Sequence, residues 1–252
     1  MAYEDAYKEQ IRAQAEVLAA REAAAEPDAG AGVIESGAGN TSPADGRRGM
    51  PRPLGEVLLV EHPAVITISN RAGAGANLLA STAVLASKGV GVASTDRGGD
   101  ITYHGPGQIV VYPVLDLNAL NLGLHEYMRM LEEAVISTCS AFGVVTMRDP
   151  SATGVWTVRD GLPAAKIAAM GVRVRRWISM HGLALNVRTN LDHFGLIVPC
   201  GLVGREVTSL ERELGPACPS FEEAQARLVA ELTALIRERE RVAAEARAKA
   251  SA

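Results

Sequence analysis

The sequence predicts an α+β fold, with mixed α/β sheets and flanking helices. Two observations lead to this fold class. Strand-like runs follow one another in groups, without the regular strand–helix alternation of a parallel α/β sheet. Helical periodicity is confined to stretches between or outside these groups. A chain of 252 residues, 48% of them hydrophobic, is long enough to bury a substantial core.

The N-terminal part divides into two segments of different composition. Residues 4–25 are rich in Ala, Glu, Arg and Gln, and Ile11, Ala15 and Leu18 lie near helical spacing, which predicts an amphipathic helix. From Pro27 the composition changes to Gly, Ala, Ser, Pro and Asp, which buries little. We therefore expect an N-terminal helix in 1–26 that packs on the main domain, a flexible low-complexity insertion in 27–53, the main domain in 54–238 and a charged helical tail in 239–252.

The main domain is predicted to contain at least seven strands. Val57–Val60 and Val65–Ile68 are two strands joined at Glu61-His62-Pro63, and Ile109–Val114 is a buried strand that follows a Gly-dense segment from Gly89 to Gly107. Further strands are expected at 144–147, 155–158, 166–176 and 179–187, with Asp160-Gly161 as a hairpin signal.

Two helices complete the domain. The first covers 124–142, where apolar residues recur at helical spacing: Leu124, Met128, Leu131, Val135 and Cys139. The second opens at Ser220, with Glu223 three residues later as in a capping box, and is expected to bury Leu228, Leu232 and Ile236.

Composition excludes several classes of protein. A net charge of −4 and a pI near 5.8 provide no global field for binding nucleic acid. The acidic start lacks the apolar core of a secretory signal, and no apolar run is long enough to span a bilayer. Three cysteines without paired spacing argue against a disulfide framework or a zinc ribbon. These observations predict a soluble, cytoplasmic protein.

Cys200 is the candidate nucleophile. It lies in Ile197-Val198-Pro199-Cys200-Gly201-Leu202, where a short apolar run breaks into a Pro/Gly turn. Such a turn presents a side chain at an edge and lets another molecule approach the bare glycine backbone. A thiol placed there becomes a nucleophile when a neighbouring group converts it to the thiolate.

A second candidate segment runs from Arg97 to Gln108. Its four glycines leave backbone N–H groups accessible, and Arg97, Tyr103 and His104 add polar tips. Such a loop can wrap a ligand carbonyl, phosphate or acyl chain, although glycine-rich turns between strands are also common. The Gly-Lys-Ser/Thr of nucleotide-binding P-loops is missing.

Lys166 begins an apolar, small-residue stretch that ends at Gly171. Partial burial would let this lysine take a proton from a thiol, or stabilise a thiolate while it stays charged. The alternative is a strand-edge lysine that reaches water. His181 either orients a neighbour, lines the cleft or is structural, and His62, His125 and His193 are taken as structural. Among the other cysteines, Cys139 is expected on a buried helix face and Cys218 in an exposed loop.

Together these segments resemble the octanoyltransferases of lipoate biosynthesis. The resemblance runs from about Glu56 to Leu214 and rests on Arg97–Gln108, Lys166–Gly171, His181–Val187 and Pro199–Gly201 in this order, with Glu61-His62-Pro63, Tyr112–Leu117, Gly154-Val155-Trp156 and Val207–Leu210. It implies the fold that biotin and lipoate protein ligases share.

The resemblance also implies a two-step reaction. Octanoyl passes from acyl carrier protein to Cys200 as a thioester, and then to a specific lysine of a lipoyl domain. Lys166 matches the family lysine that lowers the pKa of the thiol. The residues that line the acyl substrate would be Arg97, Gly98, Gly99, Asp100, Ile101, Thr102, Tyr103, His104, Ala169, Met170, Gly171, Gly182, Leu183 and Ala184.

The partners follow from that reaction. The donor is octanoyl-acyl carrier protein, and the acceptors are lipoyl domains of 2-oxo acid dehydrogenase E2 subunits and the H protein of glycine cleavage. No cofactor, metal, nucleic acid or membrane is expected, and the protein is expected to be a monomer. Arg173 and Arg175, which share a face of a predicted strand, are a candidate docking patch for the acidic carrier, with solvated strand charges as the alternative.

Two alternative functions use the same scaffold. An ATP-dependent lipoate or biotin protein ligase activates a free acid as an adenylate, and it needs no enzyme thiol. A non-catalytic protein that binds acyl groups or lipoyl domains gains nothing from an activated thiol. Cys200 and Lys166 together favour the transferase. The chain departs from the family at Ser69-Asn70-Arg71, where a Gly-Arg pair is usual, and at Asp100, where Gln is common, so the local charge of the cleft differs.

Overall fold

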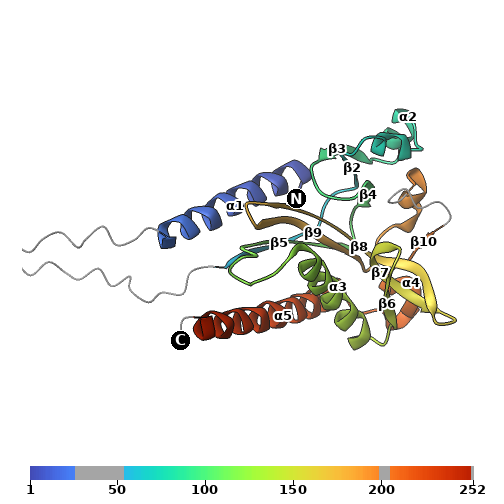
Figure 1. Ribbon diagram of the computed structural model, residues 1–252. Coiled ribbons are helices and arrows are strands. Elements are labelled where there is room, and N and C mark those ends of the chain that lie inside the picture. Colours follow the sequence, from blue (N-terminus) through green and yellow to red (C-terminus); the bar gives the residue numbers. More distant parts are fainter. Residues whose placement is uncertain (26–53, 199–204, 251–252) are drawn as a thin grey trace, which may run out of the picture.

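The computed structural model describes residues 1–25, 54–198 and 205–250. Its main part has three layers, in which helix α1 lies on one face of a large sheet and helices α3 and α5 lie on the other (Figure 1). A small second sheet adjoins the N-terminal end of α1 (Figure 1). Mixed sheets with flanking helices confirm the α+β fold that the sequence predicts.

The large sheet is mostly antiparallel. Its strand order is β1 (Gly55–Val60), β5 (Gln108–Leu115), β9 (Ile178–Asn186), β8 (Leu162–Arg175), β7 (Ala152–Arg159) and β6 (Thr146–Asp149). The short strand β10 (Glu206–Val207) pairs in parallel with β8 at Ala165 and Lys166. Because β8 is long, it pairs with β7 and β10 near Lys166 and with β9 from Ala168 onwards.

The small sheet is the main difference from the sequence prediction. It has the order β3 (Gly91–Thr95), β2 (Val65–Ser69) and β4 (Ile101–His104), so the two predicted strands at 57–60 and 65–68 exist but belong to different sheets. The Gly-dense segment, expected to be a loop, supplies β3 and β4. Their pairing with β2 overrides the weak local strand signal of these short, glycine-flanked runs.

Helices α3 (Leu124–Ala141) and α5 (Phe221–Ala250) pack on one face of the large sheet. Buried residues of α3 and α5 form the core with the sheet, among them Leu131, Val135, Cys139, Leu228 and Leu232. The predicted capping box is confirmed, since the Ser220 amide donates to Glu223 at 2.8 Å and the Glu223 amide to Ser220 Oγ at 3.2 Å. Leu124 is half exposed because it begins α3 beside an open cleft.

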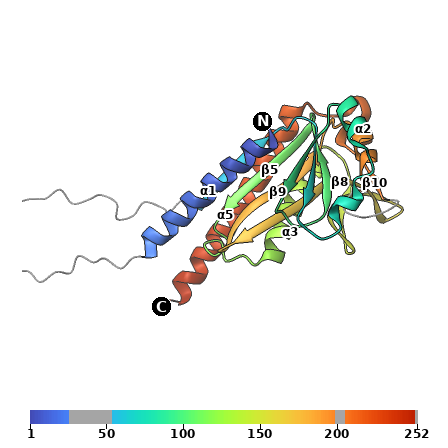
Figure 2. The same cartoon turned by 90° about the horizontal axis from the view of Figure 1, so that it is seen from above.

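Helix α1 (Tyr3–Ala25) covers the opposite face of the sheet (Figure 2). The sequence predicted a stripe through Ile11, Ala15 and Leu18, but Ile11 is 43% exposed. The buried stripe is instead Tyr3, Ala6, Gln10, Ala13 and Val17. Alanines allow the helix to approach the sheet closely, and the polar members of the stripe bond to it, so hydrophobicity alone does not identify the face.

Short elements connect the sheets: α2 (Thr82–Ser87), α4 (Leu210–Leu214) and the 3-10 turns η1 (Ala74–Asn77), η2 (Leu191–Leu196) and η4 (Gly215–Ala217). Cys218, expected to be exposed, is 9% exposed because its loop packs against the core under α5. Within the part of the chain that the structure describes, every helix is too short or too polar to cross a membrane.

Candidate active site

Lys166 is buried at the point where three strands meet. Only 7% of the residue is exposed, and it pairs with Trp156 of β7 and Val207 of β10. Its ammonium lies 4.7 Å from the centroid of the Trp156 ring, a cation–π distance. The guanidinium of Arg205 lies 4.3 Å from the same ring and pairs with Asp149. A lysine held this way is not a strand-edge side chain that reaches water.

Gly154 makes room for this lysine. Its φ is +128°, and a Cβ added there would lie 2.7 Å from the Ala168 carbonyl oxygen and 3.2 Å from Cε of Lys166. Any other residue would therefore collide with β8 and the lysine stem. The Gly-Val-Trp motif thus has two roles, because Gly154 leaves space for the lysine side chain and the Trp156 ring contacts its ammonium group.

Cys200, the predicted nucleophile, lies outside the described residues. The chain on both sides of its segment borders the Lys166 site. Phe194 of η2, before the segment, and Val207 of β10, after it, line one small cavity together with Lys166. We call this the linking cavity; it is also lined by Thr102, Gln108, Ala169, Ala184 and Asn186.

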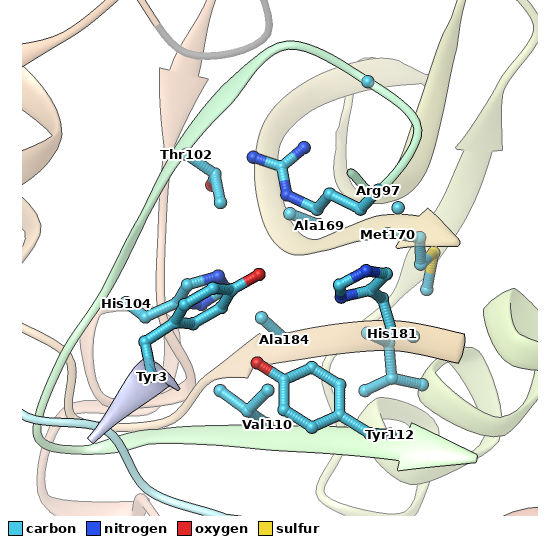
Figure 3. A pocket seen from close by; sticks show the side chains of 14 residues that line it. Tyr3, Arg97, Thr102, His104, Val110, Tyr112, Ala169, Met170, His181 and Ala184 are labelled. Atoms are coloured by element: carbon cyan, nitrogen blue, oxygen red, sulfur yellow. The ribbon is translucent and has the colours of Figure 1, made fainter. Parts of the chain in front are cut away.

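A narrow cavity continues from the linking cavity, since Thr102, Ala169 and Ala184 line both. Ten of the fourteen predicted acyl-binding residues line the narrow cavity: Arg97, Gly99, Thr102, His104, Ala169, Met170, Gly171, Gly182, Leu183 and Ala184 (Figure 3). The structure thus brings three segments that are far apart in sequence around one space.

The other four predicted residues lie elsewhere. Ile101 and Tyr103 alternate with Thr102 and His104 on β4, so they point to the opposite face and pack in the core of the small sheet. Gly98 and Asp100 border a wide cleft on the other side of the Arg97 turn, together with Lys166 and Met170.

Close backbone approach explains the glycines of these segments. The Gly98 amide donates to the Val172 carbonyl at 2.9 Å, and a Cβ on Gly171 would lie 2.6 Å from the Gly98 carbonyl oxygen. A Cβ on Gly182 would lie 2.2 Å from the Val111 carbonyl oxygen. The turn at Arg97–Asp100 therefore rests directly on β8, and β9 rests on β5.

Arg97 is held above the narrow cavity by hydrogen bonds. Its Nη2 donates to both the carbonyl and the hydroxyl oxygen of Thr67 at 3.1 Å and to the Asp100 carbonyl at 3.3 Å. These contacts fix a cationic side chain in the wall (Figure 3).

Four lining residues were not among the predicted acyl-binding set: Tyr3, Val110, Tyr112 and His181. His181 takes one of the roles left open for it, because it lines the cavity. Val110 and Tyr112 belong to the predicted buried strand β5, whose inward face could have indicated them. Tyr3 comes from the N-terminal helix α1, far along the chain from the other lining residues, and no local sequence pattern indicates that contact.

A half-buried carboxylate, Asp96, supports His181. Its Nε2 lies 2.8 Å from Asp96 Oδ1, and the other Asp96 oxygen accepts from Tyr7 at 2.8 Å and pairs with Arg173. Burial raises the pKa of Asp96, but the hydrogen bonds from His181 and Tyr7 and the charge of Arg173 outweigh it, so the pKa is lowered. Burial lowers the pKa of His181 despite the neighbouring Asp96. His181 is therefore neutral, donates from Nε2 to a carboxylate, and presents a bare Nδ1.

His104 is a second neutral histidine in the wall. Burial, with a smaller contribution from the nearby His62, lowers the pKa of His104 to about 3. Its Nδ1 lies 2.7 Å from Gln108 Oε1, while the amide of Gln108 donates to Asn186 at 2.8 Å. The narrow cavity thus has uncharged aromatic and aliphatic walls, apart from Arg97, and suits an apolar chain with few polar contacts.

Comparison with known proteins places the chain in a family. The model of the lipoyl protein ligase A/B catalytic domain matches residues 48–233. An octanoyltransferase of Christiangramia forsetii is 51% identical over 68% of this chain and 73% of its own, and one of Bacteroides fragilis is 48% identical over 71% and 80%.

Solved structures agree on the fold. A bi-partite lipoate protein ligase of Thermoplasma acidophilum has a TM-score of 0.56 at 16% identity, covering 75% of this chain and 77% of its own. A lipoate-protein ligase A bound with ATP has a TM-score of 0.57 at 16% identity, covering 75% and 79%. With this family model over most of the chain and relatives at about 50% identity, this chain belongs to the octanoyltransferases, acyltransferases of the lipoyl protein ligase A/B family.

Proposed function

We propose that the protein transfers octanoyl from acyl carrier protein to Cys200, as a thioester, and then to a lysine of a lipoyl domain. The observation that carries this proposal is the position of Lys166, buried in the linking cavity between the chain segments that flank Cys200. The linking cavity adjoins the narrow cavity through three shared lining residues, Thr102, Ala169 and Ala184. This arrangement supports a reaction beside Lys166 with the acyl chain in the narrow cavity.

The first step exchanges one thioester for another. The Cys200 thiolate attacks the octanoyl carbonyl, and the carrier thiol leaves after the tetrahedral intermediate collapses and takes up the proton that Cys200 lost. A free cysteine, with a pKa of about 8.5, is only a few per cent thiolate at neutral pH. The charge of Lys166 favours the thiolate, and its stacking on Trp156 holds that charge in place.

The second step forms an amide. The uncharged ε-amine of the acceptor lysine attacks the octanoyl-Cys200 carbonyl, the C–S bond breaks, and the amine proton passes to the departing thiolate. No ATP is needed, because the thioester is already activated. The acceptors we propose are lipoyl domains of 2-oxo acid dehydrogenase E2 subunits and the H protein of glycine cleavage.

The wide cleft gives the incoming partners a route to Lys166. It is bordered by polar and apolar side chains from five regions: Arg71, Asp100, Leu124, Met128, Ser151, Thr153 and Lys166. A carrier arm or an acceptor lysine can approach through this opening while the acyl chain stays in the narrow cavity. The proposal also keeps the cytoplasmic location expected from the sequence, since a free thiol stays reduced in that compartment. It keeps the expected monomeric state as well.

Intact mass spectrometry tests the proposal. The protein is mixed with octanoyl-acyl carrier protein without ATP, beside Cys200→Ser and the control Cys218→Ser. Wild type and Cys218→Ser should gain one octanoyl group that an apo lipoyl domain discharges, and Cys200→Ser should gain none. An unmodified wild type that becomes active only with ATP and free octanoate would establish the ligase alternative. Binding to the lipoyl domain without turnover would establish the non-catalytic alternative.

A further inference from the structure

The narrow cavity is closed at the end away from Lys166. Its far wall is made by Tyr3 of α1, Tyr112 of β5 and His181 of β9, which we call the closed end. Figure 3 shows the hydroxyl group of Tyr3 and the ring of His181 facing each other across the cavity. Tyr3 is 4% exposed and His181 1% exposed, so both residues are buried at this wall.

One face of α1 is built into the closed end. Tyr3, Tyr7 and Gln10 follow at spacings of four and three residues and therefore share a helix face. Tyr3 donates to Thr95 at 2.6 Å and stacks on His104, Tyr7 stacks on the ring of His181, and the Gln10 side chain accepts from the His181 amide at 2.7 Å. The helix is thereby positioned by the same residues that line the cavity.

The length of the narrow cavity matches a medium-length acyl chain. Along β9 its lining runs from Ala184, which the linking cavity shares, to His181 at the closed end. Three residues at about 3.3 Å per residue span roughly 10 Å. An extended eight-carbon chain, at roughly 1.3 Å per carbon, needs about 9 Å. A chain several carbons longer would meet the wall.

The wall is also polar where a longer chain would press on it. Nδ1 of His181 is buried and, among the described residues, has no hydrogen-bond partner, while its Nε2 is held by Asp96. A methylene group placed against that lone pair gives it no hydrogen bond, so a longer chain gains no compensating polar contact at this wall. A chain that stops short needs no such contact.

From these contacts we infer that α1, through Tyr3, and His181 form an end wall that sets the longest acyl chain the enzyme accepts. The inference rests on the proposed function, in which Lys166 marks the reacting end of the cavity. It assigns to the N-terminal helix a role in substrate specificity in addition to packing.

A competition experiment tests the end wall. Octanoyl-, decanoyl- and dodecanoyl-acyl carrier proteins are mixed in equal amounts with the enzyme, and the acyl adducts are counted by intact mass. The variants are Tyr3→Ala, Tyr3→Leu and the control Val17→Ala. Val17 is a buried residue of the same helix that lies about four turns beyond Tyr3. We expect the dodecanoyl-to-octanoyl ratio to rise at least tenfold in Tyr3→Ala, by less in Tyr3→Leu, and not at all in Val17→Ala.

Two results would overturn the inference. One is an unchanged ratio in Tyr3 variants that still fold and accept octanoyl; the other is an equal shift in Val17→Ala, which would indicate a loosened helix. Circular dichroism checks folding, and Tyr3→Leu decides if Tyr3→Ala does not fold. Calorimetric binding of octanoate and dodecanoate needs no reaction, so equal affinity of wild type for both would refute the wall. An absent octanoyl adduct on wild type, with octanoate still bound selectively, would instead refute the proposed function alone.

Discussion

The two ends of the narrow cavity are built in different ways. The reactive end, at Lys166, consists of neighbouring strands whose glycine and tryptophan positions lie in short motifs. The closed end is assembled from the adjacent strands β5 and β9 and from α1, which lies far from both along the chain and meets β9 through the Gln10 hydrogen bond and the Tyr7–His181 stacking. In the proposed function, neighbouring strands place the reactive lysine, and in the proposed end wall the packing of α1 sets the chain length. Changes at the reactive end should alter rate, whereas changes at the closed end should alter specificity and stability.

Removing the charge at the reactive end should have the largest effect. Lys166→Met keeps the volume but removes the cation, so the thiol returns toward its ordinary pKa and kcat/KM at pH 7 should fall by about 10²-fold or more. The loss should shrink as pH rises, because the thiolate then forms without help. Lys166→Arg keeps a charge and serves as the control. A pH–rate profile with the same apparent thiol pKa in wild type and Lys166→Met would contradict this role.

Adding a methyl group at Gly182, between the two ends of the cavity, should destabilise the fold. In Gly182→Ala the new Cβ would lie 2.2 Å from a backbone oxygen of the neighbouring strand, which cannot move aside. We expect a loss of about 3 kcal/mol in the free energy of unfolding, measured by urea denaturation. Gly195→Ala is the matched control, because its Cβ would meet nothing within 4 Å. Equal stability of the two variants would show that β9 and β5 do not approach this closely.

The buried histidines at and near the closed end should make the stability of the protein sensitive to acid. His104 has a folded-state pKa of about 3, below its unfolded value near 6.5, so the unfolded chain binds the proton first. Its contribution to stability is present above pH 6.5 and is lost as pH falls toward 3, by about 2 kcal/mol between pH 6.5 and 5. His62 and His181, whose pKa values are also lowered by burial, add in the same direction.

Urea unfolding of wild type and His104→Gln between pH 7.5 and 5 measures this contribution. The slope of stability against pH should be smaller in His104→Gln. The control His125→Gln changes an exposed histidine and should keep the wild-type slope. Identical slopes in all three proteins would mean that His104 is not buried as a neutral group.

The smallest effect is expected at the candidate docking patch. Arg173 pairs with Asp96 in the network behind His181, so the structure ties it to the closed end, whereas Arg175 is exposed. Arg175→Glu should raise the KM for octanoyl-acyl carrier protein a few-fold at low salt and much less at high salt. Arg159→Glu reverses an exposed charge at the end of β7, opposite the first residue of β8, and should leave KM unchanged. A salt-independent or equal effect of the two reversals would remove Arg175 from the docking surface.

The sequence predicts the reactive end better than the closed end. The glycine-rich segment from Arg97 and the small-residue segments around Gly171 and Gly182 were predicted to line the acyl substrate, and those segments do line one cavity. The strands β3 and β4 were missed because their pairing is settled by β2 and not by local pattern. Tyr3 was missed because α1 buries polar as well as apolar residues, which hides the true face from hydrophobic periodicity.

The measurement that tests the account most directly is the mass of the protein after mixing with octanoyl-acyl carrier protein in the absence of ATP, followed by mapping of the modified peptide. We expect one octanoyl group on the peptide that contains Cys200. It should form slowly in Lys166→Met and be removed by an apo lipoyl domain. An octanoyl group on another residue, or an unmodified protein that transfers octanoyl only with ATP, would contradict it.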